Sequence, residues 1–136
     1  MASTAHDLRE DNRTLIRRYA EAWSSGDIRS AMSFYSEDVV LRLPGRNPFA
    51  GTFEGRDEVV SAIEAIRGSF DDLPEVDVHE VLVGEEHVAV LATESGRRGG
   101  REITFRRIVV YGCTDGEICS ITVFHEDAYE VDTFFS

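Results

Sequence analysis

Two adjoining stretches decide the fold of this chain: LIRRYAEAWSSGDIRSAMSFYSEDVVLRLPG, residues 15–45, and NPFAGTFEGRDEVVSAIEAI, residues 47–66. Apolar residues recur at helical spacing up to Gly26, which is suited to ending a helix, and again after Asp27, which is suited to capping the next one. The pattern predicts two amphipathic helices, with Tyr19 on the inner face of the first. A short strand, a turn-rich loop and a third helix follow, and this order predicts a curled sheet closed by helices around a small molecule.

The chain after these two stretches changes to an alternation of period two, which is typical of β-strands. Short turns link four such segments, so the sequence predicts an antiparallel meander. The expected elements are helices over 8–25 and 28–35, a strand over 39–43, a loop over 45–56, a helix from Asp57 to Ile66, strands over Glu75–Val83, 87–94, 101–112 and Glu117–His125, and a helical turn over Ala128–Phe135. Helices followed by an antiparallel sheet define an α+β fold, here in one domain of residues 8–136 after a flexible tail of residues 1–7.

The composition restricts the partners of this protein. Of its 136 residues, 42% are hydrophobic and 29% are charged, and the formal net charge is −12. Such an acidic protein repels nucleic acid and anionic membrane surfaces, so we expect neither as a partner. No stretch reaches the roughly 20 apolar residues that span a bilayer. The first residues also lack the apolar run of a signal peptide, so we expect a cytoplasmic protein.

The spacing of cysteine and histidine residues does not indicate a metal. Cys113 and Cys119 lack the paired CxxC spacing of a zinc site, and His79 and His87 form neither an HxH nor an HxxxH motif. The sequence therefore predicts no metal site and no cofactor.

The strand expected over residues 101–112 is apolar on both faces. Ile103, Phe105 and Val109 lie on one face, and Ile108 and Val110 lie on the other. A strand of this kind is usually covered on both sides. If helices cover one side, a second copy of the protein can cover the other, so we expect a homodimer through the sheet.

Four segments of the chain resemble the SnoaL-like family, within the nuclear transport factor 2-like and ketosteroid isomerase-like superfamily. They are RRYAEAWSSGD, FYSEDVVLRLPG, NPFAGTFEGRDEV and the closing HEDAYEVDTFF. The resemblance covers nearly the whole chain. It implies a cone-shaped, cystatin-like α+β barrel in which a strongly curved antiparallel sheet wraps around helices and encloses an apolar pocket. It also supports a dimer, but this fold serves isomerases, cyclases, dehydratases, epoxide hydrolases and binding proteins alike.

Ketosteroid isomerases resemble the chain without gaps over residues 18–44. Their oxyanion tyrosine falls on Tyr19, whereas their catalytic aspartate falls on Leu43. Counting back eight residues from Gly116 places their protonated aspartic acid on Ile108. Leucine and isoleucine cannot transfer protons, so a steroid isomerase of the usual mechanism is not expected.

Three residues are candidates for catalysis. Tyr19 would donate a hydrogen bond to an oxyanion, or would be a core tyrosine bonded to the backbone. His125, at the end of the last strand, would transfer a proton, or would be an inert histidine at the rim of the sheet. Cyclases of the SnoaL type use an acidic base with a histidine nearby. The resemblance suggests Asp127 for that base, although this residue is also placed to cap the final helical turn.

The residues expected to line the pocket follow from the alternation along the strands. In the face assignment carried over from the isomerases, the inward residues are Ile121, Val123 and His125 on the last strand and Thr104, Arg106, Ile108 and Val110 on its neighbour. Arg106 would then bind a carboxylate or an enolate, while Arg107 would lie on the surface or at an interface. The expected ligand-binding residues are Trp23, Leu43, Phe49, Phe53, Arg106, Ile108, Val110, Ile121 and Val123.

Two functions are consistent with these residues. The first is a cofactor-free enzyme that isomerises, cyclises or dehydrates a small hydrophobic carbonyl compound by acid–base chemistry. The alternative is a non-catalytic binder of a small hydrophobic ligand, or a dimeric interaction module, as the apolar Leu43 and Ile108 would allow.

Overall fold

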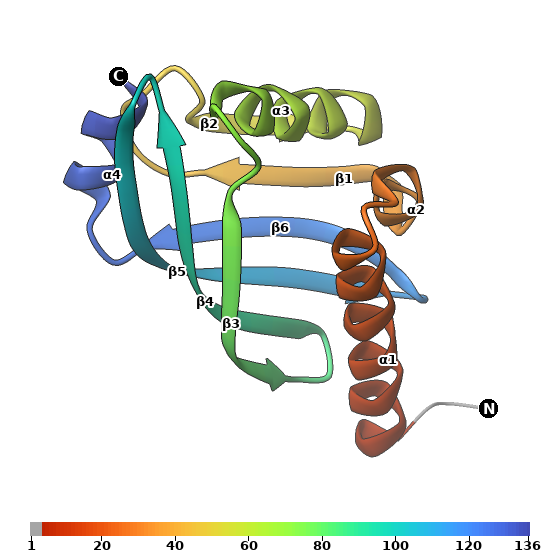
Figure 1. The fold of residues 1–136 in the computed structure, drawn as a ribbon. Helices are drawn as coiled ribbons and strands as arrows, with labels where there is room; N and C mark the ends of the chain where they lie inside the picture. Colours follow the sequence, from red (N-terminus) through yellow and green to blue (C-terminus); the bar gives the residue numbers. More distant parts are fainter. Residues whose placement is uncertain (1–3) are drawn as a thin grey trace.

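A computed structural model of the protein describes residues 4–136. Four helices and six strands follow one another along these residues (Figure 1). They are α1 (Ala5–Ser24), α2 (Ile28–Met32), β1 (Tyr35–Leu43), β2 (Gly51–Glu54), α3 (Arg56–Ser69), β3 (Glu75–Val83), β4 (His87–Arg98), β5 (Arg101–Thr114), β6 (Glu117–His125) and α4 (Ala128–Phe135). The predicted α+β fold is confirmed.

The first helix begins earlier than the sequence pattern indicated. The Thr4 side chain accepts a hydrogen bond from the Asp7 backbone, and the Asp7 side chain accepts one from Thr4 in return, so a capping box fixes the start at Ala5. The expectation of a tail was therefore wrong for residues 5–7, and residues 1–3 lie outside the described part of the chain. The end of α1 was predicted correctly: Gly26 has a φ of +80° and the Asp27 side chain caps α2.

The sheet has the strand order β2-β1-β6-β5-β4-β3. The antiparallel meander from β3 to β6 was predicted from the alternation and is confirmed. Two features differ from the expectation: β1 runs parallel to β6, and β2 forms within the segment expected to be a loop. The sheet curls without closing, so β2 and β3 remain as its two edges (Figure 1).

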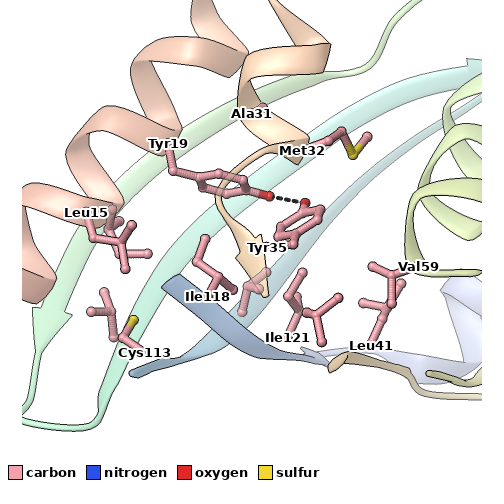
Figure 2. Packing of buried hydrophobic residues seen from close by; sticks show 14 of the residues in the cluster. Leu15, Tyr19, Ala31, Met32, Tyr35, Leu41, Val59, Cys113, Ile118 and Ile121 are labelled. Carbon is pink, nitrogen blue, oxygen red and sulfur yellow. Dashed lines mark hydrogen bonds between the residues drawn. The ribbon is translucent and has the colours of Figure 1, made fainter. Parts of the chain in front are cut away.

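One face of the sheet is packed against the helices, and we call it the inner face. Near α1 and α3 it carries a large apolar cluster, part of which Figure 2 shows. Near α4 a second cluster joins Ile103 and Phe105 of β5 to Val131, Phe134 and Phe135. The strand residues of the first cluster include Leu41, Val109, Ile121 and Val123. We call the opposite side of the sheet the outer face.

The face assignment expected for β5 was wrong. Directly paired residues share a face, and Val109 pairs with the buried Val123, so the odd-numbered residues of β5 point inward. Ile108 pairs with Phe124 on the outer face, where both side chains are exposed. The expected inward orientation of Thr104, Arg106, Ile108 and Val110 is thus reversed.

A β-bulge explains this reversal. Near the turn, Cys113 pairs with Ile118, and a register extended from that pair would set Ile108 opposite Val123. The register instead shifts by one residue at Cys119, because Gly112 pairs with Ser120. A one-residue shift moves every side chain of a strand to the other face. The orientation of β6 itself was predicted correctly, since Ile121 and Val123 are buried on the inner face.

Candidate functional site

Three ionisable side chains lie close together on the inner face in the middle of the central strands, apart from Arg98 and Arg101 at the far end of β4 and β5. Arg107 of β5 lies in one cross-strand row with Ala92 of β4 and His125 of β6. Glu94 lies one row further along β4, opposite Phe105. The row of Arg107 lies between the two apolar clusters of the core, and the row of Glu94 includes Phe105 of the second cluster. We call Glu94, Arg107 and His125 the inner-face group and regard it as the candidate site.

Arg107 and Glu94 form a loose ion pair inside the protein. The Nε atom of Arg107 lies 3.7 Å from Oε2 of Glu94, and their side chains are 22% and 16% exposed. That separation exceeds hydrogen-bonding distance, and Nε has no hydrogen-bond partner among residues 4–136. Burial raises the pKa of the Glu94 carboxyl, and the neighbouring Arg107 charge offsets part of that rise.

His125 is half-buried beside the second apolar cluster. Its ring meets the Phe105 ring edge-on, with the centroids 5.4 Å apart. Burial and then the positive charge of Arg107 lower the pKa of the imidazole, and the negative charge of Asp132 opposes them with a smaller effect. The imidazole is therefore neutral near pH 7, so one ring nitrogen is free to accept a proton.

Tyr19 lies deep in the first cluster, on the inward side of α1. Its hydroxyl oxygen is 2.6 Å from that of Tyr35, the bond drawn as a dashed line in Figure 2. Tyr19 was expected either to donate to an oxyanion or to bond to the backbone. This hydrogen bond is a third arrangement, because the partner of Tyr19 is a second phenol. Burial raises the pKa of both phenols, so both stay neutral at physiological pH. One of their two protons forms the mutual bond, and the other remains available for donation.

An aromatic contact links this tyrosine pair to the strand that carries Arg107. The Tyr111 ring packs edge-on against Tyr19, with the centroids 5.5 Å apart. Tyr111 and Arg107 lie on the same face of β5, and the Arg107 charge opposes the rise that burial causes in the pKa of Tyr111. The tyrosine pair and the inner-face group thus belong to one continuous surface.

Asp127 is not part of the inner-face group. Its Oδ1 atom accepts a hydrogen bond from the Glu130 backbone at 3.0 Å, which caps α4. The residue is exposed at the surface. Of the two roles weighed from the sequence, the structure supports the cap, so we leave Asp127 out of the proposed catalytic groups.

The residues expected to bind a ligand fall into three sets. Trp23, Leu43 and Phe53 pack at the margin of the first cluster with Ile121 and Val123, which are buried in it. Phe49 belongs to the second cluster, with its ring centroid 5.4 Å from that of Phe135. The outward set is Arg106, Ile108 and Val110, which cannot contact a ligand on the inner face.

Two depressions on the other side of the sheet are lined mainly by outward-facing side chains. One, of about 300 Å³, has walls that include Leu91, Arg106, Ile108 and Phe124, and it also touches Ala92, Arg107 and His125 of the inner row. The other, of about 660 Å³, lies over β1, β2 and the loop between them, and it also touches Phe124. The outer face is therefore hollowed where the sequence suggested that the inner face would be.

Glu94 and Arg107 were missed as site residues in the sequence. The residue-level signal was present, because each is a charged position within an apolar alternation. The alternation did not show on which face of the sheet these side chains lie, because the bulge at Cys119 reverses the face assignment expected for β5.

In residues 4–136, no group of three histidine, cysteine, aspartate or glutamate side chains is suited to hold a metal ion. No helix in that range is long and apolar enough to cross a membrane.

Solved structures with the same architecture define the class of this fold. A curled, unclosed sheet with helices on its inner face occurs in proteins described as NTF2-like and as cystatin-like. Within that class, the chain belongs to the SnoaL-like family, because the model of the SnoaL-like domain matches residues 16–121.

Individual relatives agree with this assignment. An uncharacterised protein of Mycobacterium tuberculosis is 24% identical over 123 residues, which cover 90% of this chain and 94% of the relative. The structure of Bal32a, from a soil-derived mobile gene cassette, aligns with a TM-score of 0.88 at 22% identity over 95% of this chain and 99% of that one. A proposed polyketide cyclase from Xanthomonas campestris aligns with a TM-score of 0.72 at 18% identity, over 95% and 99%. At such identities the structural likeness concerns the fold alone.

Proposed function

We propose that this protein is an enzyme that moves protons on a small, largely apolar carbonyl compound without a bound cofactor. The observation that carries the proposal is the inner-face group, where burial shifts the pKa of Glu94 upward and the pKa of His125 downward. The rise moves the pKa of Glu94 toward the neutral range, where a carboxyl can act as an acid, and the fall leaves His125 unprotonated near pH 7, as a base must be. A structural neighbour described as a proposed polyketide cyclase supports this reaction class.

The roles follow from the protonation states. A neutral His125 removes a proton from the carbon beside the carbonyl, and the positive charge of Arg107 stabilises the oxyanion that forms. Glu94, when protonated, returns a proton to the product. Isomerisation, cyclisation and dehydration all share the first of these steps. The predicted part of Tyr19 as a second oxyanion donor would use the phenol proton left free by its bond with Tyr35.

The shared first step can be tested without knowing the natural substrate. 2-Tetralone, an apolar ketone with exchangeable α-hydrogens, is incubated with the protein in deuterated buffer, and its α-hydrogen signal is followed by NMR. We expect the wild type to accelerate the exchange over buffer, and His125→Asn and Glu94→Gln each to slow it by a factor of about 100. Tyr19→Phe should slow it less, by about tenfold, because Arg107 remains.

His79 supplies the matched control for the exchange experiment. It is a histidine of β3 that bonds to Thr93, whose strand position faces outward. His79→Asn should therefore exchange at the wild-type rate. Wild-type exchange no faster than buffer, or undiminished exchange in His125→Asn, would refute the proposed chemistry.

A non-catalytic binder remains the second candidate. It is favoured by the unpaired Nε of Arg107, which offers a hydrogen bond to a ligand whether or not chemistry follows. Binding of a ligand on the inner face without any 2-tetralone exchange would support this candidate over the enzyme. The predicted cytoplasmic location is part of neither test and stays a prediction.

We also propose the homodimer through the outer face. Ile108 and Phe124 pair there with 40% and 53% of their surface exposed, and Leu82 of β3 is 50% exposed. Exposed apolar residues that adjoin one another on a sheet commonly mark an interface. We expect sedimentation of a dimer, dissociation in Phe124→Glu, and no change in Leu73→Glu, an exposed leucine before β3. A wild-type monomer at micromolar concentration would refute the dimer.

A further inference from the structure

We infer that the inner-face group binds an organic carboxylate, with the carboxylate on Arg107 and the apolar body of the ligand on the valines of β3. The inference rests on the proposed function in that it uses the same site. It goes further because it names the class of ligand and the two surfaces that recognise it.

The first observation is the state of the Arg107 guanidinium. Its Nε is shielded from solvent and has no acceptor among residues 4–136, while Oε2 of Glu94 stays 3.7 Å away. A buried donor without an acceptor destabilises the folded protein, and a ligand that supplies the acceptor removes this cost. A planar carboxylate fits the guanidinium fork with two parallel hydrogen bonds, which a single distant oxygen of Glu94 does not provide.

The second observation is the charge of the surroundings. His125 is the nearest ionisable neighbour on β6, and burial keeps its imidazole neutral near pH 7. Burial also favours the neutral form of Glu94 on β4. Arg107 is thus the one group in this set that is always charged, so the site favours a ligand of negative charge.

The third observation is an apolar strip beside the inner-face group. Val78 pairs with Ala92, which pairs with Arg107, so all three lie in one row of the inner face. Val76 pairs with Glu94 in the next row. The two valines are 51% and 45% exposed, although their partners on β4 are largely buried. Uncovered apolar side chains next to an unpaired cation match a ligand that has an apolar body and one anionic end.

The test uses two probes of equal shape, 2-naphthoate and 2-naphthamide, which differ in charge. Binding to the ¹⁵N-labelled protein is followed through the arginine Nε–Hε signals in NMR spectra. We expect 2-naphthoate to shift the Arg107 signal downfield and to bind at least about tenfold more tightly than 2-naphthamide.

Three variants locate the effect. Arg107→Gln should bring the affinities of the two probes to within about twofold of each other. Arg106→Gln is the matched control on the outer face and should keep the wild-type preference. Glu94→Gln should bind 2-naphthoate more tightly than the wild type does, because the ionised fraction of Glu94 competes with the ligand for Arg107, and Glu94 is the only carboxylate within 4.0 Å of Arg107 in the described residues.

Several outcomes would overturn the inference. They are equal binding of the two probes by the wild type, no shift of the Arg107 signal at millimolar 2-naphthoate, or an equal loss of preference in Arg106→Gln. The wild-type spectra decide the question even if Arg107→Gln fails to fold. The exchange of 2-tetralone is measured separately, so the two proposals can fail independently. Carboxylate binding without exchange would refute the proposed enzyme and support this inference. Exchange without a preference for the carboxylate would support the enzyme and refute this inference.

Discussion

Two adjacent arginines on opposite faces of strand β5 differ in their burial and in their ion pairing. On the outer face, Arg106 pairs with Glu126 at 3.2 Å, and both side chains are about two-thirds exposed, at 67% and 63%. On the inner face, Arg107 and Glu94 are mostly buried, yet their nearest charged atoms stay 3.7 Å apart. The well-formed ion pair is thus in solvent, where a pair contributes little, and the poorly formed one is inside, where unpaired groups cost most.

The difference shows which pair needs an explanation beyond folding. An exposed ion pair is an ordinary feature of a protein surface. A buried, incompletely bonded arginine and glutamate reduce stability, and a protein retains such groups where they serve a function. The following variants test whether the two faces differ as this comparison requires.

The largest effect is expected from a charge placed on the inner face of β6, and the same charge on the outer face of β6 is its control. Val123→Asp puts a carboxylate into the first apolar cluster, where the native side chain is only 7% exposed. We expect a loss of about 4 kcal/mol or more, enough to unfold a marginal domain. Thr122→Asp is the control, since residue 122 pairs with Arg42 on the outer face and an opposite charge there is tolerated. Urea unfolding followed by circular dichroism measures both, and similar midpoints would contradict the assignment of faces.

A smaller effect of opposite sign is expected from removing the inner ion pair. The double variant Glu94→Gln, Arg107→Met replaces two partly satisfied buried charges with neutral side chains. We expect it to raise the free energy of unfolding by about 1–3 kcal/mol, as replacement of buried ion pairs often does. The outer double variant Arg106→Met, Glu126→Gln should stay within about 0.5 kcal/mol of the wild type. A destabilised inner variant would show that Arg107 serves the fold instead of a ligand.

The tyrosine pair provides a buried polar contact that is fully formed, in contrast to Arg107. Tyr19→Phe and Tyr35→Phe each leave one hydroxyl without its partner, so each should cost about 1–2 kcal/mol. The double variant should cost clearly less than the sum, because neither hydroxyl then remains unpaired. A double-mutant cycle of unfolding free energies measures the coupling, and additive losses would mean that the bond contributes nothing.

The smallest effect concerns the pH dependence contributed by Glu94. Burial raises its pKa in the folded state above the ordinary value of 4.5. Its contribution to stability is therefore complete below pH 4.5 and is lost as pH rises from there through the folded-state pKa. Glu94→Gln does not ionise. The melting temperature of this variant minus that of the wild type should therefore increase with pH over this window and stay constant above it. The exposed Glu126→Gln should show no such gain.

The order and type of most elements follow from local pattern. The cap at Asp27, the meander from β3 to β6 and the helix Ala128–Phe135 depend on neighbouring residues, and all three were predicted. The start of β1 was not, because Tyr35 shares the spacing of α2 while its place in the strand depends on pairing with Ile118 of distant β6.

The candidate site was predictable only in part, for a reason specific to β5. His125 was found because the resemblance to SnoaL-type cyclases indicates a histidine near the end of the last strand, and the face assignment carried over from the isomerases pointed it inward. Since β5 is apolar on both faces, its own sequence does not say which face is inner. The missing fact was the extra residue at Cys119, which only cross-strand pairing reveals.

The parallel pairing of β1 with β6 has a consequence for the synthesis of this chain. Leu41 finds its partner Ile121 near the other end of the sequence, and the two share the first apolar cluster. A ribosome adds about 5–20 residues per second, so β1 waits seconds for β6 with one edge unpaired. Contacts between residues so far apart in the sequence slow folding. The first helices and β1 therefore form a stable core only after β6 has emerged from the ribosome.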